Sequence, residues 1–262
     1  RILVTNDDGI NAPGLEVLEA IAAEVAGPKG EVWTVAPATE QSGVGHCVGY
    51  LKPTLISQMG PRRFAVDGTP ADCVLAGLYD AMLEAQPDVI LSGVNRGNNA
   101  AENVLYSGTI GAAMEGALQG FRAIALSQYY GPENLKLENA FEAAADHGVK
   151  VVQDLIAHAP WDEGAHYPLF YNVNFPPVPA HAVKGVRVAR QGYRENTKFG
   201  VAPHTAPNGR RFLWITGGAQ NVPTADGTDA AANLGGYISV TPLRADLTAH
   251  ERLDALQSAL ET

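Results

Sequence analysis

The sequence contains no hydrophobic run near the ~20 residues that a membrane-spanning helix needs, so we expect no membrane partner. It is poor in cysteine, with only Cys47 and Cys73, whose spacing fits no metal motif. Few cysteines and no export signal predict free thiols and a cytoplasmic location. Basic residues are also scarce, because 18 Lys and Arg stand against 28 Asp and Glu, a net charge of −10. This balance argues against a nucleic-acid polymer as partner, although a pocket for one nucleotide is compatible with it.

The rest of the composition is that of a folded globular protein. Hydrophobic residues make up 46% and charged residues 18% of 262 residues, which excludes global disorder and allows one large domain. Short apolar runs alternate with amphipathic segments, and we expect strands at residues 2–5, 32–36, 89–95, 123–126 and 169–174. The first two strands enclose a helical segment and form a βαβ unit. The pattern predicts an α/β fold with a Rossmann-like three-layer core and a mostly parallel sheet.

The pattern changes toward the C-terminal end. Residues 186–190 and 211–215 alternate like antiparallel strands, and a polar stretch separates them. We predict a protruding β-hairpin arm over about residues 185–216 of a single domain. The core is expected over residues 1–184 and 217–262, with a last strand at 237–240 and a terminal helix at 253–260.

An acidic pair, Asp7-Asp8, follows the first strand and precedes Gly9. The pair can be a turn that caps the next helix, or it can bind a hard divalent cation, which prefers oxygen ligands. Gly9 allows the backbone to leave the strand, so that both carboxylates can reach one ion. Ser42 follows the second strand and Asn95 ends the third, at the same edge of a parallel sheet. Together these side chains would form a mixed oxygen site whose two negative charges balance a divalent ion.

A second candidate site is the stretch Ser107-Gly108-Thr109, which opens a helix of small residues. Unpaired N–H groups at a helix N-terminus hold anions, the two hydroxyls add donors, and Gly108 lets an oxyanion approach the backbone. The alternative is that Ser107 is only the N-cap of the helix. Asn99 is a further candidate for phosphate binding. No Gly-Lys dipeptide is present, which excludes a Walker A loop.

These residues lie in motifs that resemble the SurE family, the survival protein E nucleotidases. The resemblance extends in order over nearly the whole chain, through residues 6–14, 36–43, 68–74, 92–97, 106–116 and 237–243. It implies a hydrolase, a metal-dependent phosphatase that acts on nucleoside 5′-monophosphates and often on 3′-monophosphates. The alternative from another class is a non-catalytic nucleotide-binding regulatory module, which the edge of an α/β sheet could equally house.

The resemblance also implies roles for the candidate residues. One divalent ion, Mg²⁺ or Mn²⁺, would be held by the residues at the strand ends, namely Asp7, Asp8, Ser42 and Asn95. Phosphate would be bound by Asn99, Ser107, Gly108 and Thr109. A water activated by the ion would attack phosphorus with Asp8 as the catalytic residue, while direct attack by an Asp carboxylate stays open.

Two further expectations follow from the resemblance. SurE proteins form dimers that often pair into tetramers through such arms, so we expect a homodimer or homotetramer. The sequence departs from the family pattern at Ala100-Ala101 and at Asn103, beside the expected substrate site. These departures leave the nucleobase preference open.

Overall fold

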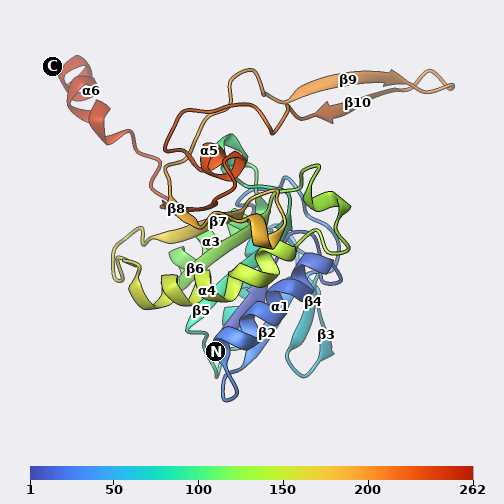
Figure 1. Ribbon diagram of the computed structural model, residues 1–262, viewed down its shortest axis with the longest axis vertical. Coiled ribbons are helices and arrows are strands. Elements are labelled where there is room, and N and C mark those ends of the chain that lie inside the picture. The colour runs from blue at the N-terminus through green and yellow to red at the C-terminus, as the bar shows by residue number, and fades with distance from the viewer. Residues whose placement is uncertain (262) are drawn as a thin grey trace.

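The computed structural model describes residues 1–261 and has a nine-stranded sheet at its centre (Figure 1). The strand order is β3-β4-β2-β1-β5-β6-β7-β11-β8, and all neighbours from β4 to β7 are parallel. The strands of this sheet are β1 (Ile2–Thr5), β2 (Val32–Pro37), β3 (Ile56–Gly60), β4 (Arg63–Val66), β5 (Val89–Arg96), β6 (Arg122–Gln128), β7 (Phe170–Phe175), β8 (Val186–Val188) and β11 (Ile238–Leu243). The predicted mostly parallel sheet is confirmed.

Helices cover both faces of this sheet, so the predicted three-layer core is also confirmed. Alternation along β1 shows the layering, because Ile2 and Val4 face the apolar layer under α1 and α4, whereas Leu3 faces the layer under α2 and α3. The α-helices are α1 (Pro13–Ala26), α2 (Pro70–Ala76), α3 (Gly108–Leu118), α4 (Glu142–His158), α5 (Asp229–Leu234) and α6 (Leu253–Leu260). Shorter helical turns are η1 (Gly77–Ala81), η2 (Ala101–Leu105), η3 (Asn134–Lys136), η4 (Ala180–Ala182) and η5 (His250–Arg252). None of the helices in this described part of the chain is long and apolar enough to cross a membrane.

The C-terminal part contains the expected hairpin, but its strands pair differently. β10 (Arg211–Thr216) pairs in antiparallel fashion with β9 (Gly200–Thr205), and β8 pairs in parallel with β11 in the main sheet. The expected pairing of residues 186–190 with 211–215 is therefore wrong. β8 pairs with β11 although its three residues are exposed at the sheet edge, whereas Pro203 and the polar residues around β9 hid that strand in the sequence. The division of the chain at about residues 185–216 stays a prediction.

The β9–β10 hairpin, here called the arm, projects away from the main sheet (Figure 1). Every residue of its two strands is exposed. Phe212, Trp214 and Ile215 are among them, and more than half of each of these side chains is accessible. The predicted terminal helix is confirmed as α6, which also projects from the body and has no buried residue (Figure 1).

Asp72 joins the start of α2 to a neighbouring loop. Its backbone N–H donates to the Thr69 hydroxyl at 3.2 Å, while its carboxylate accepts from the Thr69 N–H at 2.9 Å and from the Gly49 N–H at 2.8 Å. We expect Asp72→Ala to lower the free energy of unfolding by about 1–2 kcal/mol, because the capping box and the loop contact are both lost. Urea unfolding measures this difference. The control, Asp80→Ala at an exposed position, should leave the midpoint in place; equal midpoints for both variants would contradict the assignment.

Candidate active site at the edge of the parallel sheet

The loop after β1 is a tight turn that brings the acidic pair out of the sheet. The Asn6 side chain donates to the Gly9 carbonyl at 2.9 Å and accepts from the Gly9 N–H at 3.2 Å. Gly9 has φ +101°, a conformation that side chains with a Cβ rarely adopt. The turn therefore lets the backbone leave the direction of the strand directly after Asp7 and Asp8.

Asp7 lies beneath the first turn of α3. Its side chain is buried, and its Oδ1 accepts a hydrogen bond from the Thr109 hydroxyl at 2.7 Å. A Cβ on Gly108 would lie 2.9 Å from the Cβ of Asp7, so this close approach requires glycine at position 108. Gly108 thus makes room for the Asp7 side chain.

Burial disfavours the ionised form of both carboxyl groups and so raises their pKa values. Loss of solvent raises the pKa of Asp7 from 3.8 to about 6, although the bond from Thr109 acts in the opposite direction. Loss of solvent also raises the pKa of Asp8, against the lowering effect of the Arg96 backbone N–H, which donates to Asp8 at 2.9 Å. A divalent cation would supply the missing positive charge, and hard cations prefer oxygen donors of this kind. The residues present therefore fit such an ion.

Ser42 and Asn95 approach the acidic pair from the neighbouring strands β2 and β5. The Gln41 N–H donates to the Asp7 carbonyl at 2.7 Å, which ties the loop of Ser42 to that of Asp7. The Ser42 hydroxyl donates to Glu40 at 2.8 Å. The Asn95 amide nitrogen donates to the Gly97 carbonyl at 2.9 Å, which directs the amide and leaves its oxygen as a potential ligand.

The candidate phosphate-binding residues have partners of their own. Ser107 is the N-cap of α3 and accepts from the Ile110 N–H at 3.1 Å, so the capping interpretation is confirmed while phosphate binding stays a prediction. Thr109 uses its hydroxyl on Asp7. Asn99 is buried, and its amide nitrogen donates to the Ser127 hydroxyl at 2.8 Å.

Most of the predicted residues surround one cavity of about 260 Å³. Asp7, Ser42, Asn95, Asn99 and Ser107 line it. The other three predicted residues lie outside this lining: Asp8 is bound to the Arg96 backbone, while Gly108 and Thr109 contact Asp7. The cavity thus brings together three of the four candidate cation ligands and two of the four candidate phosphate contacts, which come from loops far apart in the sequence.

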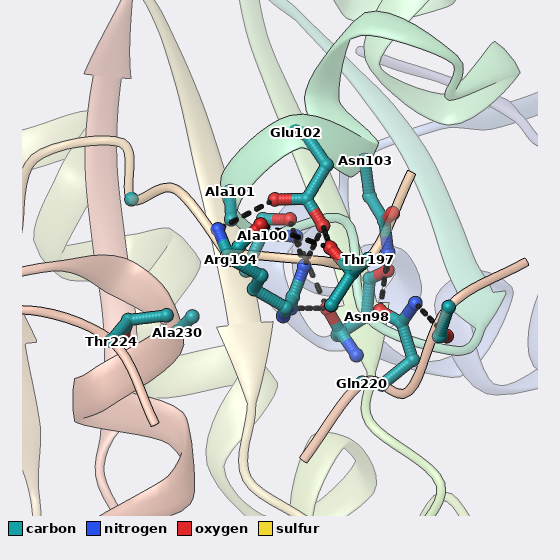
Figure 2. Close-up of polar contacts among 12 residues, drawn as sticks. Asn98, Ala100, Ala101, Glu102, Asn103, Arg194, Thr197, Gln220, Thr224 and Ala230 are labelled. Carbon is teal, nitrogen blue, oxygen red and sulfur yellow. Dashed lines mark hydrogen bonds and ion pairs between the residues drawn. The ribbon is translucent and has the colours of Figure 1, made fainter. Parts of the chain in front are cut away.

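Sequence analysis did not single out several other residues that line this cavity. Thr197, Phe199 and Gln220 contribute to it from the two ends of the arm. Figure 2 shows how Arg194 and Thr197 contact Glu102, next to the cavity. These residues lie in polar segments without a motif or an apolar period, so the sequence contains no local signal for them.

The fold and the site define a class of protein. It is an α/β protein whose acidic pair lies at the carboxyl ends of adjacent parallel strands, the edge where open α/β sheets bind their ligands. Beside the acidic pair, the site contains the N-terminus of α3, which favours bound anions.

Comparison with known proteins identifies the family within that class. The family model described as "Survival protein SurE" matches residues 2–198. The "5′-nucleotidase SurE" of Roseobacter denitrificans is 67% identical over 256 residues, with 98% of each chain covered. That of Ruegeria pomeroyi is 65% identical over 260 residues, covering 99% of this chain and 100% of the relative. The crystal structure of the SurE protein from Aquifex aeolicus superposes with a TM-score of 0.79 at 35% identity, covering 98% of each chain. The chain belongs to the SurE family, as its motifs indicated.

The raised pKa of Asp7 has a consequence for stability. Between pH 3.8 and about 6 the unfolded chain releases the Asp7 proton while the folded protein retains it, so the free energy of unfolding falls as pH rises and levels off above that window. We expect Asp7→Asn, which removes this charge, to raise the melting temperature of the metal-free protein at pH 8 by on the order of 5 °C.

Thermal melts in chelator from pH 5 to pH 8 measure the effect. The gain should be smaller at pH 5 than at pH 8, because the parent is then largely protonated at Asp7. The surface variant Asp154→Asn serves as control. A variant that melts below the parent at pH 8 would contradict an uncompensated charge at Asp7.

Proposed function

We propose that this chain is a divalent-metal-dependent 5′-nucleotidase, a hydrolase that converts nucleoside 5′-monophosphates to nucleoside and phosphate. The observation that carries the proposal is the single cavity that joins the buried carboxylate of Asp7 to Ser107 at the N-terminus of α3. An acidic, cation-compatible end beside an anion-binding helix end suits a phosphomonoester. Full-length relatives with the name "5′-nucleotidase SurE" support the same activity.

One Mg²⁺ or Mn²⁺ ion is the proposed cofactor, with Asp7, Asp8, Ser42 and Asn95 as its ligands. Among residues 1–261 no three His, Cys, Asp or Glu side chains gather as a metal site, and we assign the neutral oxygens of Ser42 and Asn95 to the set beside the two carboxylates. The ion, when bound, polarises a phosphoryl oxygen and lowers the pKa of a water molecule. The two carboxylates balance its charge without adding the repulsion that more carboxylates would exert on a phosphate dianion.

The remaining roles fall to the residues around the acidic pair. Asp8 is less buried than Asp7, and we assign it to hold and orient the attacking water. Ser107 and the first N–H groups of α3 receive the phosphate and stabilise the charge that develops on its oxygens. Asn99 contributes a further polar contact to the phosphate. Thr109 acts through Asp7, because its hydroxyl holds that carboxylate in place.

Phosphate release from AMP tests this function. We expect turnover with Mn²⁺ or Mg²⁺, loss of turnover in EDTA, and recovery when the metal is restored. Asp8→Asn should abolish turnover while the circular dichroism spectrum and the melting transition are kept, because one carboxylate is too little charge to hold the ion. Asp154→Asn, an exposed Asp on α4, is the matched control and should retain activity.

Two outcomes would contradict the proposal. Tight AMP binding without phosphate release would favour a nucleotide-binding regulatory module. Full activity of Asp8→Asn would remove Asp8 from the site. Measuring 3′-AMP beside AMP establishes whether both monophosphates are substrates.

We also propose that the arm joins copies of the chain into a homodimer or homotetramer. Its strands are exposed on both faces and carry Phe212, Trp214 and Ile215. A two-stranded ribbon is marginally stable alone, and an exposed apolar patch usually marks an interface. A second copy of the same arm is a suitable cover, because soluble oligomers are mostly symmetric.

Shortening the arm tests the assembly. Gly200 and Thr216 lie opposite each other in the hairpin, so residues 201–215 can be replaced by an Asn-Gly turn without moving either end. We expect light scattering to report a lower mass for this variant than for the parent, with metal binding preserved. A parent protein that is monomeric at micromolar concentration would refute the proposed assembly.

A further inference from the structure

The cavity at the acidic pair has a second half, formed by the base of the arm. We call residues 194–199 and 217–220 the arm root, since they lead into and out of the β9–β10 hairpin. Thr197, Phe199 and Gln220 of the root line the same cavity as Asp7 and Ser42. The cavity of about 260 Å³ lies just below the roughly 300–1,000 Å³ typical of small-ligand sites. A single small ligand that reaches the acidic end therefore also meets the arm root.

An ion pair between the buried Arg194 and the partly exposed Glu102 holds the arm root against the body (Figure 2). The Arg194 side chain is only 1% exposed, and its guanidinium donates to Glu102 at 3.1 Å, to the Ala100 carbonyl at 3.1 Å and to the Asn98 side chain at 2.8 Å. Glu102 also accepts from the Thr197 hydroxyl at 3.0 Å and from the backbone N–H of Arg194 at 3.1 Å. Moving the root away would leave the buried guanidinium of Arg194 without its partners, which is energetically costly. The root is therefore held in place against residues 98–102.

The arm root presents an aromatic surface to the cavity. Phe199 lies against Tyr106 with ring centroids 4.8 Å apart and planes at 76°. Both rings line the cavity, and about half of each side chain is exposed. Beside them, the Asn103 amide donates to Gln220 at 2.7 Å, so amide groups flank the rings. Aromatic faces with flanking amides are suited to a flat, hydrogen-bonding ring.

We infer that the arm root is the nucleoside-binding half of the site, in which the nucleobase stacks on Phe199, beside Tyr106, while the phosphate lies at the acidic end. This assignment rests on the proposed nucleotidase function and gives the arm a part in catalysis besides assembly. Stacking is available to every base because every base has a π-face, so the site accepts purine and pyrimidine nucleotides alike. Phe199 is thus a substrate-binding residue that contributes to selection of nucleotides over other phosphomonoesters.

Comparison of a nucleotide with a base-free phosphomonoester tests the inference. In Phe199→Ala, we expect kcat/KM for AMP to fall about ten-fold, the size of one lost base–aromatic stack, mainly through KM. Activity on ribose 5-phosphate, which has no base, should stay unchanged. Competitive inhibition by adenosine should weaken, while inhibition by inorganic phosphate persists.

The matched control is Tyr79→Ala on η1, away from the arm. Tyr79 is an aromatic residue at least as exposed as Phe199, 62% against 50%, and it lies outside the cavity lining. It should leave kcat/KM for AMP and for ribose 5-phosphate at the parent values.

The outcomes separate this inference from the proposed function. If the parent releases phosphate from neither substrate, the nucleotidase function fails and the inference fails with it. If the parent hydrolyses AMP but Phe199→Ala changes neither substrate, or lowers both equally, only the inference is overturned.

Discussion

The position of the Asp7 carboxylate is the constraint on which the site depends. Its backbone carbonyl accepts from the loop of Ser42, its side chain accepts from Thr109, and its Cβ leaves room only for glycine at position 108. One residue therefore sets the distances between the ends of β1 and β2 and the start of α3. The same burial raises the pKa of this carboxyl to about 6, so the folded protein holds a charge that it cannot solvate. The carboxylate that we propose as a cation ligand therefore lowers the free energy of unfolding of the metal-free protein at neutral pH.

The arm root places a second constraint on the same cavity. Arg194 is buried and reaches the loop of Asn98 from about a hundred positions further along the chain. The loop next to Asn99 is therefore held from outside the α/β core. Both strands of the hairpin are exposed along their whole length, so the anchored root and the projecting arm are distinct parts of one segment.

The sequence predicted the core well because its signals are local. The apolar runs at β1, β2 and β5 fall where the sheet has them, and parallel topology then places Asp7, Ser42 and Asn95 at one edge. The partner predicted for residues 186–190 was wrong because alternation indicates a strand but not its partner, and β8 pairs with β11 at the edge of the main sheet instead. The bond from the Thr109 hydroxyl to Asp7 depends on how α3 packs and has no signal in the sequence, while phosphate binding by Thr109 stays a prediction. Arg194 and Phe199 act through contacts with residues more than 90 positions away, for which no local pattern exists.

The distribution of the cavity lining along the chain sets the order in which it can be completed during synthesis. All proposed cation and phosphate ligands lie within the first 109 residues, whereas another part of the lining comes from residues 197–220. A nascent chain that has emerged only as far as β6 already contains every one of those ligands, but it has no arm root to close the cavity. Contacts of such long separation form late, because the intervening chain must first be ordered. The wall that we assign to the nucleoside is therefore the last part of the site to come from the ribosome.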